Sequence, residues 1–276
     1  MVALDEWHGA TAIETGPLSP DLRFFACVRS SEGRKRILDE WRDMPRSVTV
    51  VVADNLRAAQ ESHVVILGCK PRAAEDLLRT PGLAQALGGK LVISILGGTS
   101  TQRLEELLYS DTRLEHHNRC TFVSAIPNIA AECGDSITIV AEGASPQASE
   151  TTRAIFSLVG CVKIVPKCAT SQLTALCASA PAFLALIMES MVKDSVRRGI
   201  ATEEAVEMAA LVMKGTATLV LAGMTPKNII DRVAVPGGST EKGLQMMKDL
   251  NVPESIYEAV RVTSDATSGL MTKSKD

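Results

Sequence analysis

The stretch Val64-Val65-Ile66-Leu67-Gly68-Cys69-Lys70-Pro71 joins four consecutive aliphatic residues to an abrupt stop. A short apolar run rich in β-branched residues is typical of a buried strand, and the glycine and proline after it mark its end. Similar runs recur through the first part of the chain. They predict strands at seven places, namely 23–28, 47–52, 63–68, 91–96, 121–125, 137–141 and 162–165.

Segments with helical periodicity separate these runs, at 32–41, 56–61, 72–79, 101–108 and 148–158. Alternating strands and helices predict an α/β fold, with a mostly parallel sheet covered by helices. Such sheets bind ligands at the carboxyl ends of their strands. After residue 168 only helical patterns remain, at 170–198, 202–222, 240–250 and 253–271. We therefore expect an α/β domain over residues 1–166 and an all-α domain over residues 167–276.

The helical part contains one segment, 173–188, that is apolar nearly all round. A helix of this kind must be buried, either in a core or in a subunit interface. A helical domain of about 110 residues buries such a helix more easily by pairing with a second copy. We expect a homo-oligomer, a dimer or higher.

Bulk composition excludes several classes of partner. The net charge of −3 gives no reason to expect nucleic acid or an anionic membrane surface. The longest apolar runs are short for a membrane span, and the first residues lack the features of a signal peptide. The seven cysteines form no C-x-x-C pair, which predicts reduced, mostly buried thiols and no metal site. A cytoplasmic location follows as the expectation.

The first predicted strand ends at Val28 and is followed by Arg29 and Ser30. In dinucleotide-binding folds, the residue at this place selects the cofactor, and an arginine favours the 2′-phosphate of NADP over NAD. The alternative is that these are basic residues at the exposed start of a helix. The sequence leaves both interpretations open.

A second candidate site is the stretch Val233-Ala234-Val235-Pro236-Gly237-Gly238-Ser239-Thr240, which runs into the helix expected at 240–250. Two glycines let the backbone approach a ligand closely. A helix N-terminus offers unpaired N–H groups and a positive dipole end, which suit a carboxylate or a phosphate. A capped helix after a tight turn would have the same sequence.

Together these motifs resemble the pyrroline-5-carboxylate reductase family over residues 8–272. Pro236–Thr240 is similar to the family's Ser-Pro-Gly-Gly-Thr-Thr motif, and the segment 174–183 is similar to its Thr-Ala-x-Ser-Gly-Ser-Gly-Pro-Ala-Tyr motif. Further matches are Asp54-Asn55, Lys70-Pro71 and Pro127-Asn128, in the order that the family has them.

The resemblance implies a Rossmann-like domain followed by a dimerisation domain, and NAD(P)H-dependent reduction of the C=N bond of a cyclic imino acid. The substrate would be pyrroline-5-carboxylate, giving proline, or a related imine of a specialised pathway. Thr240 would bind substrate or assist proton delivery. The implied substrate contacts are Gly237, Gly238, Ser239, Thr240 and Glu189. The implied contacts to NADP(H) are Arg29, Ser30, Asn55, Gly68, Cys69, Lys70, Pro71, Gly97 and Asn128.

The chain also departs from the family. Its first residues carry no Gly-x-Gly-x-Met-Gly, so the first strand and the phosphate-binding loop have no evident counterpart. There are three explanations: the gene model is incomplete, the protein no longer binds a dinucleotide, or it binds the cofactor in an atypical way. Val235 replaces the family serine, and Gly223 stands about where members often carry a glutamate.

These departures keep a second function open. The alternative is a non-catalytic or cofactor-free paralogue that acts as a small-acid binder or as a partner subunit. A third hypothesis, an NADP-dependent β-hydroxyacid dehydrogenase, shares the two-domain layout, but the Pro-Gly-Gly-Ser-Thr loop argues against it.

Overall fold

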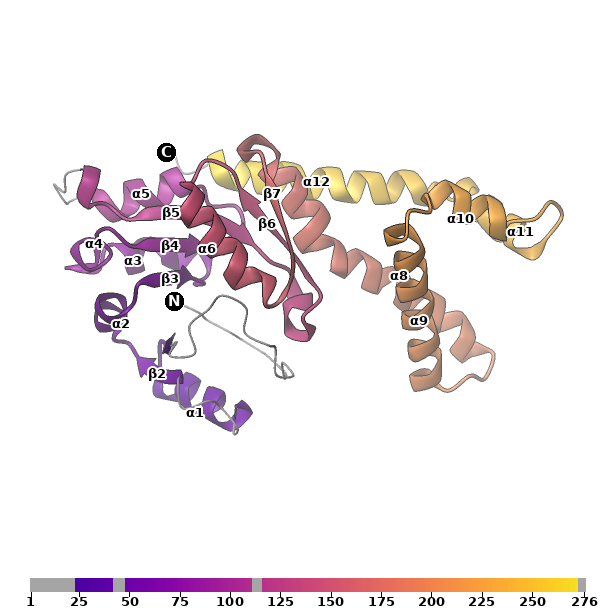
Figure 1. Cartoon of the computed structure of the whole chain (residues 1–276). Coiled ribbons are helices and arrows are strands. Elements are labelled where there is room, and N and C mark those ends of the chain that lie inside the picture. The colour runs from indigo at the N-terminus through magenta and orange to yellow at the C-terminus, as the bar shows by residue number, and fades with distance from the viewer. Residues whose placement is uncertain (1–22, 42–47, 111–115, 273–276) are drawn as a thin grey trace. The chain divides into compact units, whose positions relative to one another are not determined.

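A computed structural model describes residues 23–41, 48–110 and 116–272 (Figure 1). The chain forms two compact units. The first comprises the residues up to Ala178 together with those from Thr263 onward, and the second is Ser179–Val262. The first unit thus extends past the domain boundary predicted at residue 166, and that boundary stays a prediction.

The strands of the first unit lie where the apolar runs predict them, with ends that differ by at most two residues. They are β1 (Phe24–Val28), β2 (Val48–Val52), β3 (Val64–Leu67), β4 (Leu91–Ser94), β5 (Thr121–Ile126), β6 (Ser136–Ala141) and β7 (Gly160–Val165). Every described strand pair is parallel except β5 with β6. The mostly parallel sheet is thereby confirmed.

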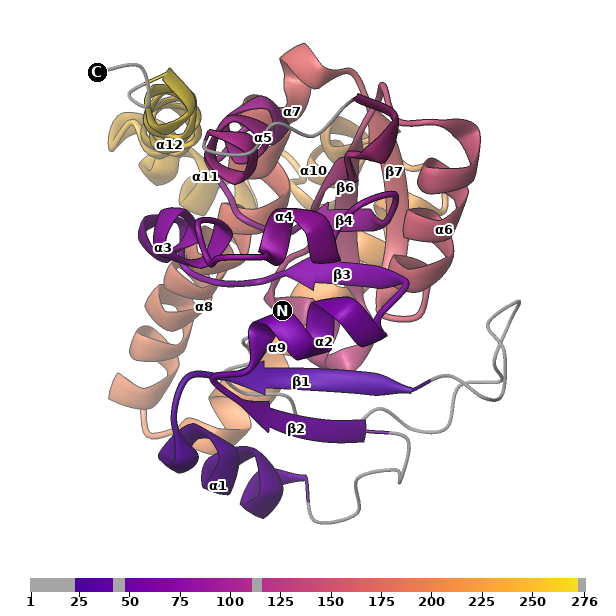
Figure 2. The ribbon, with the colours of Figure 1, turned by 90° about the vertical axis from the view of Figure 1, so that its left-hand side faces the viewer.

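Helices cover both faces of the sheet (Figure 2). The helices of this part are α1 (Ser31–Glu40), α2 (Asn55–Glu61), α3 (Ala74–Leu78), α4 (Leu83–Ala86), α5 (Thr101–Tyr109) and α6 (Pro146–Ser157). Neighbouring strand residues point to opposite faces. Val92 packs in the cluster that contains Leu104 of α5, whereas Ile93 packs in the cluster that contains Phe156 of α6.

The sheet is interrupted between β1 and β3. β1 pairs with β2 alone, while β3 is the first strand of the order β3-β4-β5-β6-β7. Figure 2 shows β1 and β3 running in the same direction, on either side of an interval that no described strand fills. Both strands are wholly apolar in sequence (FFACV and VVIL), as is typical of central strands. The residues that would form a first strand of this sheet lie outside the described residues, so the possible lack of that strand stays a prediction.

The remaining helices are α7 (Thr170–Thr174), α8 (Ala180–Arg197), α9 (Thr202–Leu221), α10 (Pro226–Val233), α11 (Ser239–Asp249) and α12 (Val252–Thr272). The single helix predicted over 170–198 is interrupted by a π-helical turn at Ala175–Ser179. Proline at position 181 accounts for the break, because it has no N–H to donate four residues back. The sequence analysis missed α10, although Thr225 caps it and Pro226 follows, which is a typical helix start.

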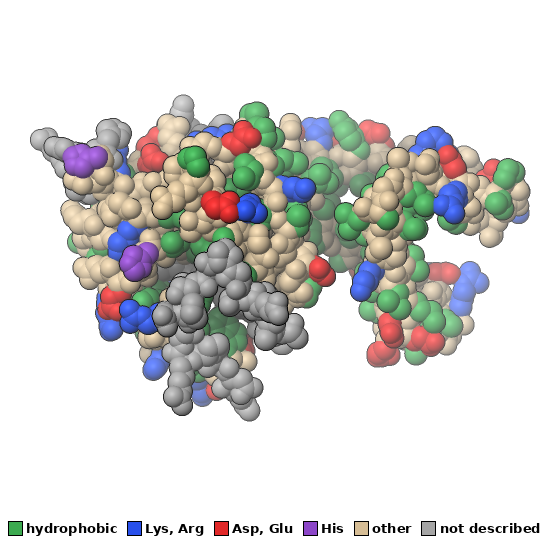
Figure 3. All heavy atoms as spheres, viewed as in Figure 1, with side chains coloured by type: hydrophobic (Ala, Val, Ile, Leu, Met, Phe, Trp, Pro, Cys, Tyr) green, Lys and Arg blue, Asp and Glu red, His purple; other side chains and the backbone are tan. Residues whose placement is uncertain are grey.

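The second unit buries little of its own apolar surface. Its described core consists of Val192, Ala205 and Ala209 with Met188 packed against them. Hydrophobic side chains are exposed along α8–α11 (Figure 3), among them Leu186, Leu211 and Leu221. The helical run 167–197 is long and apolar enough to cross a membrane by length and composition, and only 11% of its most apolar window is buried. A face of this kind requires a covering partner.

The cysteines differ from expectation. Cys27 and Cys120 are buried and Cys69 and Cys177 are half-buried, but Cys133, Cys161 and Cys168 are exposed. The prediction of mostly buried thiols is therefore wrong. Cys161 lies in β7, which is the outermost strand of the larger sheet, and the other two lie in short 3-10 turns.

Candidate active site

The stretch Val235–Thr240 forms a tight turn that leads into α11. Gly237 has a φ of 76°, a left-handed conformation that glycine adopts without strain. The Gly238 N–H donates to the Val235 carbonyl at 3.0 Å, and Gly238 is the N-cap of the helix. The Pro-Gly-Gly sequence thus sets the turn and brings Ser239 and Thr240 to the first positions of α11.

The first turn of α11 offers free donors. Ser239 and Thr240 are exposed, and no hydrogen bond joins either hydroxyl to another described residue. The N–H groups of a helix's first turn have no partner within the helix. This arrangement can bind a small carboxylate through backbone N–H groups and hydroxyls.

Sequence reasoning missed Glu241 as a member of this loop. Its Oε2 accepts a hydrogen bond of 2.7 Å from the Gly237 N–H. A signal was present, because an acidic residue three positions after an N-cap commonly reaches back to the chain before the helix. The carboxylate therefore lies beside the free donors of Ser239 and Thr240.

Glu189, the other residue that the resemblance implies for substrate binding, lies on α8. It forms an ion pair with Lys193, one turn along the same helix, with Nζ and Oε1 3.2 Å apart. Both side chains are 61% exposed, so the pair is held only loosely. No described hydrogen bond or ion pair joins Glu189 to the loop, and its role stays a prediction.

The predicted cofactor residues Arg29, Ser30 and Asn55 follow β1 and β2. The Ser30 hydroxyl accepts from the Gly33 N–H at 3.1 Å and caps α1, while Arg29 is exposed. Asn55 is the first residue of α2. Two positions before Asn55, Ala53 has a φ of 51°, which is costly for a residue other than glycine. Strain of this kind gathers at functional sites, and here it falls at the carboxyl end of a parallel strand.

A second group of predicted cofactor residues follows β3 and β4. Gly68 and Cys69 are half-buried and Lys70 is exposed, and Pro71 starts a 3-10 turn. Burial raises the pKa of the Cys69 thiol, so the thiol stays protonated. Gly97 faces open space, because a Cβ there would meet no atom within 4 Å. The predicted residues of both groups therefore lie at carboxyl ends of parallel strands.

Asn128, predicted as a cofactor contact, has its polar groups engaged in structural bonds. Its Nδ2 donates to the Cys177 carbonyl at 2.9 Å, and its Oδ1 accepts from the Ala130 N–H at 3.0 Å. Residue 181, the ordinary helical donor to the Cys177 carbonyl, is proline and has no N–H. Asn128 supplies the donor in its place, a bond that the sequence analysis did not anticipate.

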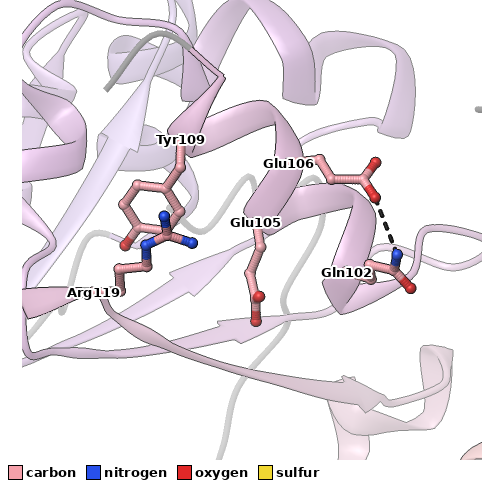
Figure 4. A pocket seen from close by; sticks show the side chains of 5 residues that line it. All are labelled: Gln102, Glu105, Glu106, Tyr109 and Arg119. Atoms are coloured by element: carbon pink, nitrogen blue, oxygen red, sulfur yellow. Dashed lines mark hydrogen bonds between the residues drawn. The ribbon is translucent and has the colours of Figure 1, made fainter. Parts of the chain in front are cut away.

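A surface pocket of about 290 Å³ lies elsewhere, beside α5 (Figure 4). Its lining side chains are largely engaged with one another. Gln102 donates to Glu106 at 3.1 Å, and the Arg119 guanidinium lies 4.6 Å from the centre of the Tyr109 ring. None of the predicted site residues lines it.

Comparison with known protein families gives two matches. The family described as pyrroline-5-carboxylate reductase dimerisation matches residues 169–270. The family described as NADP oxidoreductase, coenzyme F420-dependent, matches residues 11–98. The first match covers the helices that expose their apolar faces, and the second covers β1–β4.

Individual proteins are similar over nearly the whole chain. A pyrroline-5-carboxylate reductase of Lophium arboricola is 36% identical over 98% of this chain and 87% of its own length. The enzyme of the same name from Schizosaccharomyces pombe is 32% identical over 90% of this chain and 86% of its own length. Among solved structures, the Plasmodium falciparum pyrroline carboxylate reductase with NADP bound has a TM-score of 0.75 at 19% identity. It covers 90% of this chain and 98% of its own, which establishes the common fold.

Proposed function

The chain belongs to the pyrroline-5-carboxylate reductase family, and from that premise we propose that it reduces the C=N bond of a cyclic imino acid with NADPH. The substrate that fits best is pyrroline-5-carboxylate, which yields proline. The observation that carries the proposal is the similarity to named reductases over nearly the whole chain. No observation favours a non-catalytic binder or partner subunit.

The strand ends fit NADP(H) in the described part of the chain. Arg29 and Ser30 would hold the adenosine end, with the arginine suited to a 2′-phosphate. Asn55, Lys70 and Gly97 would line the cofactor along the sheet, where Gly97 leaves open space. The bound cofactor supplies a hydride to the C=N carbon.

The Pro-Gly-Gly loop has the chemistry that the substrate needs. The N–H groups of Ser239 and Thr240 would hold the substrate carboxylate at the positive end of α11. The Thr240 hydroxyl would bind the substrate beside them. Holding the ring in one orientation contributes strongly to the rate, and an iminium carbon needs no strong general base.

The helices of residues 169–270 form the dimerisation domain of the family, and a second copy would cover their exposed apolar side chains. The protein is accordingly a homo-oligomer, and we propose a dimer or a higher assembly. We further propose that it works in the cytoplasm, with no nucleic-acid or membrane partner.

The direct test is imine-dependent oxidation of NADPH, followed by absorbance. We expect Thr240→Val to lower kcat/KM for pyrroline-5-carboxylate by about 10-fold to 100-fold, the effect of losing one hydrogen bond to a charged group. Thr263→Val, at a half-buried position on α12, is the matched control and should retain most of the activity. A wild-type chain that is folded and oligomeric but reduces no cyclic imine would refute the proposal.

A further inference from the structure

Glu241 carries a carboxylate that is fixed in the substrate loop but only partly used there. Its Oε2 accepts the 2.7 Å hydrogen bond from the Gly237 N–H, and no described residue donates to its Oε1. The side chain is exposed at the third position of α11. One carboxylate oxygen is therefore held in place while the other faces solvent.

The surroundings of this oxygen are asymmetric in charge. On one side are the free N–H groups and hydroxyls of Ser239 and Thr240, which attract an anion. The oxygen of Glu241 itself attracts a cation. Lys242 follows on the same helix and is exposed, and its side chain forms no hydrogen bond or ion pair with another described residue. Gly237 leaves the approach open, since a Cβ at that position would meet no atom within 4 Å.

A group that binds anions and a group that binds cations lie side by side in this loop. They match a ligand that carries a negative and a positive charge close together. A cyclic imino acid in its reactive form is such a ligand, because the protonated nitrogen is bonded to the carbon that carries the carboxylate. We propose that Glu241 binds the protonated nitrogen of the substrate while the first turn of α11 holds its carboxylate. This inference rests on the proposed function and extends it to the ionic form of the substrate.

Two consequences follow for recognition. A carboxylate beside the nitrogen favours the protonated iminium over the neutral imine, so more of the bound substrate is in the form that accepts hydride. It also discriminates against rings of the same shape that lack a cationic nitrogen, since the fixed carboxylate then has no partner. Glu241 would thus set specificity for the charge of the ring atom.

The kinetic test compares Glu241→Gln with the wild type on two imines. Glutamine keeps an oxygen that can accept from the Gly237 N–H, so the turn is preserved while the charge is removed. We expect kcat/KM to fall by about 10-fold to 100-fold on both pyrroline-5-carboxylate and the carboxylate-free 1-pyrroline. The alkaline limb of the pH profile of kcat, which reports the bound substrate, should also move to lower pH by about one unit, as expected for a tenfold loss.

The matched control is Glu254→Gln, which removes a carboxylate from the third position of α12. It should change neither imine's kcat/KM more than twofold. A Glu241→Gln enzyme that matches the wild type, or that loses activity only on the carboxylated imine, would overturn the inference. The second result would mean that Glu241 only shapes the carboxylate site.

A binding measurement separates this inference from the proposed reaction. Titration calorimetry compares L-proline with cyclopentanecarboxylate, which has the ring and the carboxylate but no nitrogen. The wild type should favour proline by at least tenfold, and Glu241→Gln should remove most of that preference. If no imine is reduced but this preference depends on Glu241, the proposed reaction fails and the inference stands. No preference in the wild type would overturn the inference, whatever the activity.

Discussion

At the residue scale, local chemistry determines which side chains are available to react. Cys120 is buried just before β5, and the Tyr109 hydroxyl lies 3.3 Å from the Cys120 sulfur. Burial raises the pKa of the Cys120 thiol to about 11. Burial likewise raises the pKa of Tyr109, so neither group ionises near neutral pH. The pair is therefore a structural contact with little nucleophilic character.

This predicts slow alkylation of Cys120. At pH 8 a thiol with a pKa of about 11 is ionised in roughly one molecule in a thousand. Iodoacetamide should therefore label the exposed Cys133 and Cys161 well before Cys120, as followed by peptide mass spectrometry. In urea all cysteines should react at similar rates.

The raised pKa of Cys120 also makes the stability of the folded protein depend on pH. Because the folded pKa lies above the ordinary value of 9.0, burial of the neutral thiol adds stability below about pH 9. That stability is lost as the pH rises through about 11. If Cys120 were labelled as fast as Cys133 in the folded protein, the Cys120 thiol would not be buried with a raised pKa.

At the element scale, the most informative contact joins the loop after β5 to the π-helical turn. The side chain of Asn128 donates to the Cys177 carbonyl at 2.9 Å, which the missing N–H of Pro181 leaves without its ordinary donor. Two motifs that are far apart in the sequence are thus coupled by one hydrogen bond. π-Helical turns are frequent at functional sites, and this one begins the long apolar helix.

We expect Asn128→Ala to lower the free energy of unfolding by about 1–3 kcal/mol, because a half-buried carbonyl loses its donor. Urea unfolding measures the change. The exposed Asn228→Ala on α10 is the control and should change stability by no more than about 0.5 kcal/mol.

Pro181→Ala provides a second check, since it restores an N–H four residues after Cys177. In the Pro181→Ala background, Asn128→Ala should lower the free energy of unfolding clearly less than it does in the wild type. A double-mutant cycle would measure the difference. An equal loss of stability in both backgrounds would show that the Asn128 side chain does not replace the missing N–H of residue 181.

The elements also show which features could be predicted from the sequence and which could not. The apolar runs predicted all seven described strands, because short apolar runs rich in β-branched residues leave a clear local signal. The Pro-Gly-Gly stretch predicted the turn and the start of α11 for a similarly local reason. The bond from Asn128 to Cys177 could not be predicted, since it depends on how the sheet and α7 pack. Glu241 was missed because the sequence analysis considered only the glycines and hydroxyls of this stretch.

At the scale of the whole molecule, the helical unit is incomplete as a single chain. Only Val192, Ala205 and Ala209 form its buried core, whereas Met208 and Leu211 on α9 are 54% and 58% exposed. At about 25 cal/mol per Å² of buried apolar area, covering these exposed side chains would add to the stability of the helical unit. Association of two copies is therefore part of the folding of these helices.

Leu211→Asp should weaken that association. A charge placed in an apolar interface has no partner there, and we expect a dissociation constant at least a hundredfold higher. Light scattering after size-exclusion chromatography measures the mass. Gln147→Asp on the exposed side of α6 adds the same charge and should leave the mass unchanged. A wild-type protein of single-chain mass would contradict the expected assembly.

The interval between β1 and β3 has a consequence for folding. In the described part of the chain, no strand ladder joins the β1–β2 pair to the larger sheet, and α2 contacts both strands of the pair. Parts linked by few hydrogen bonds open independently, each with its own free energy. We expect β1, β2 and α1 to form a separate cooperative unit that opens while the five-stranded sheet remains protected. The end of the molecule proposed to select NADP would then also be the least stable part of its sheet.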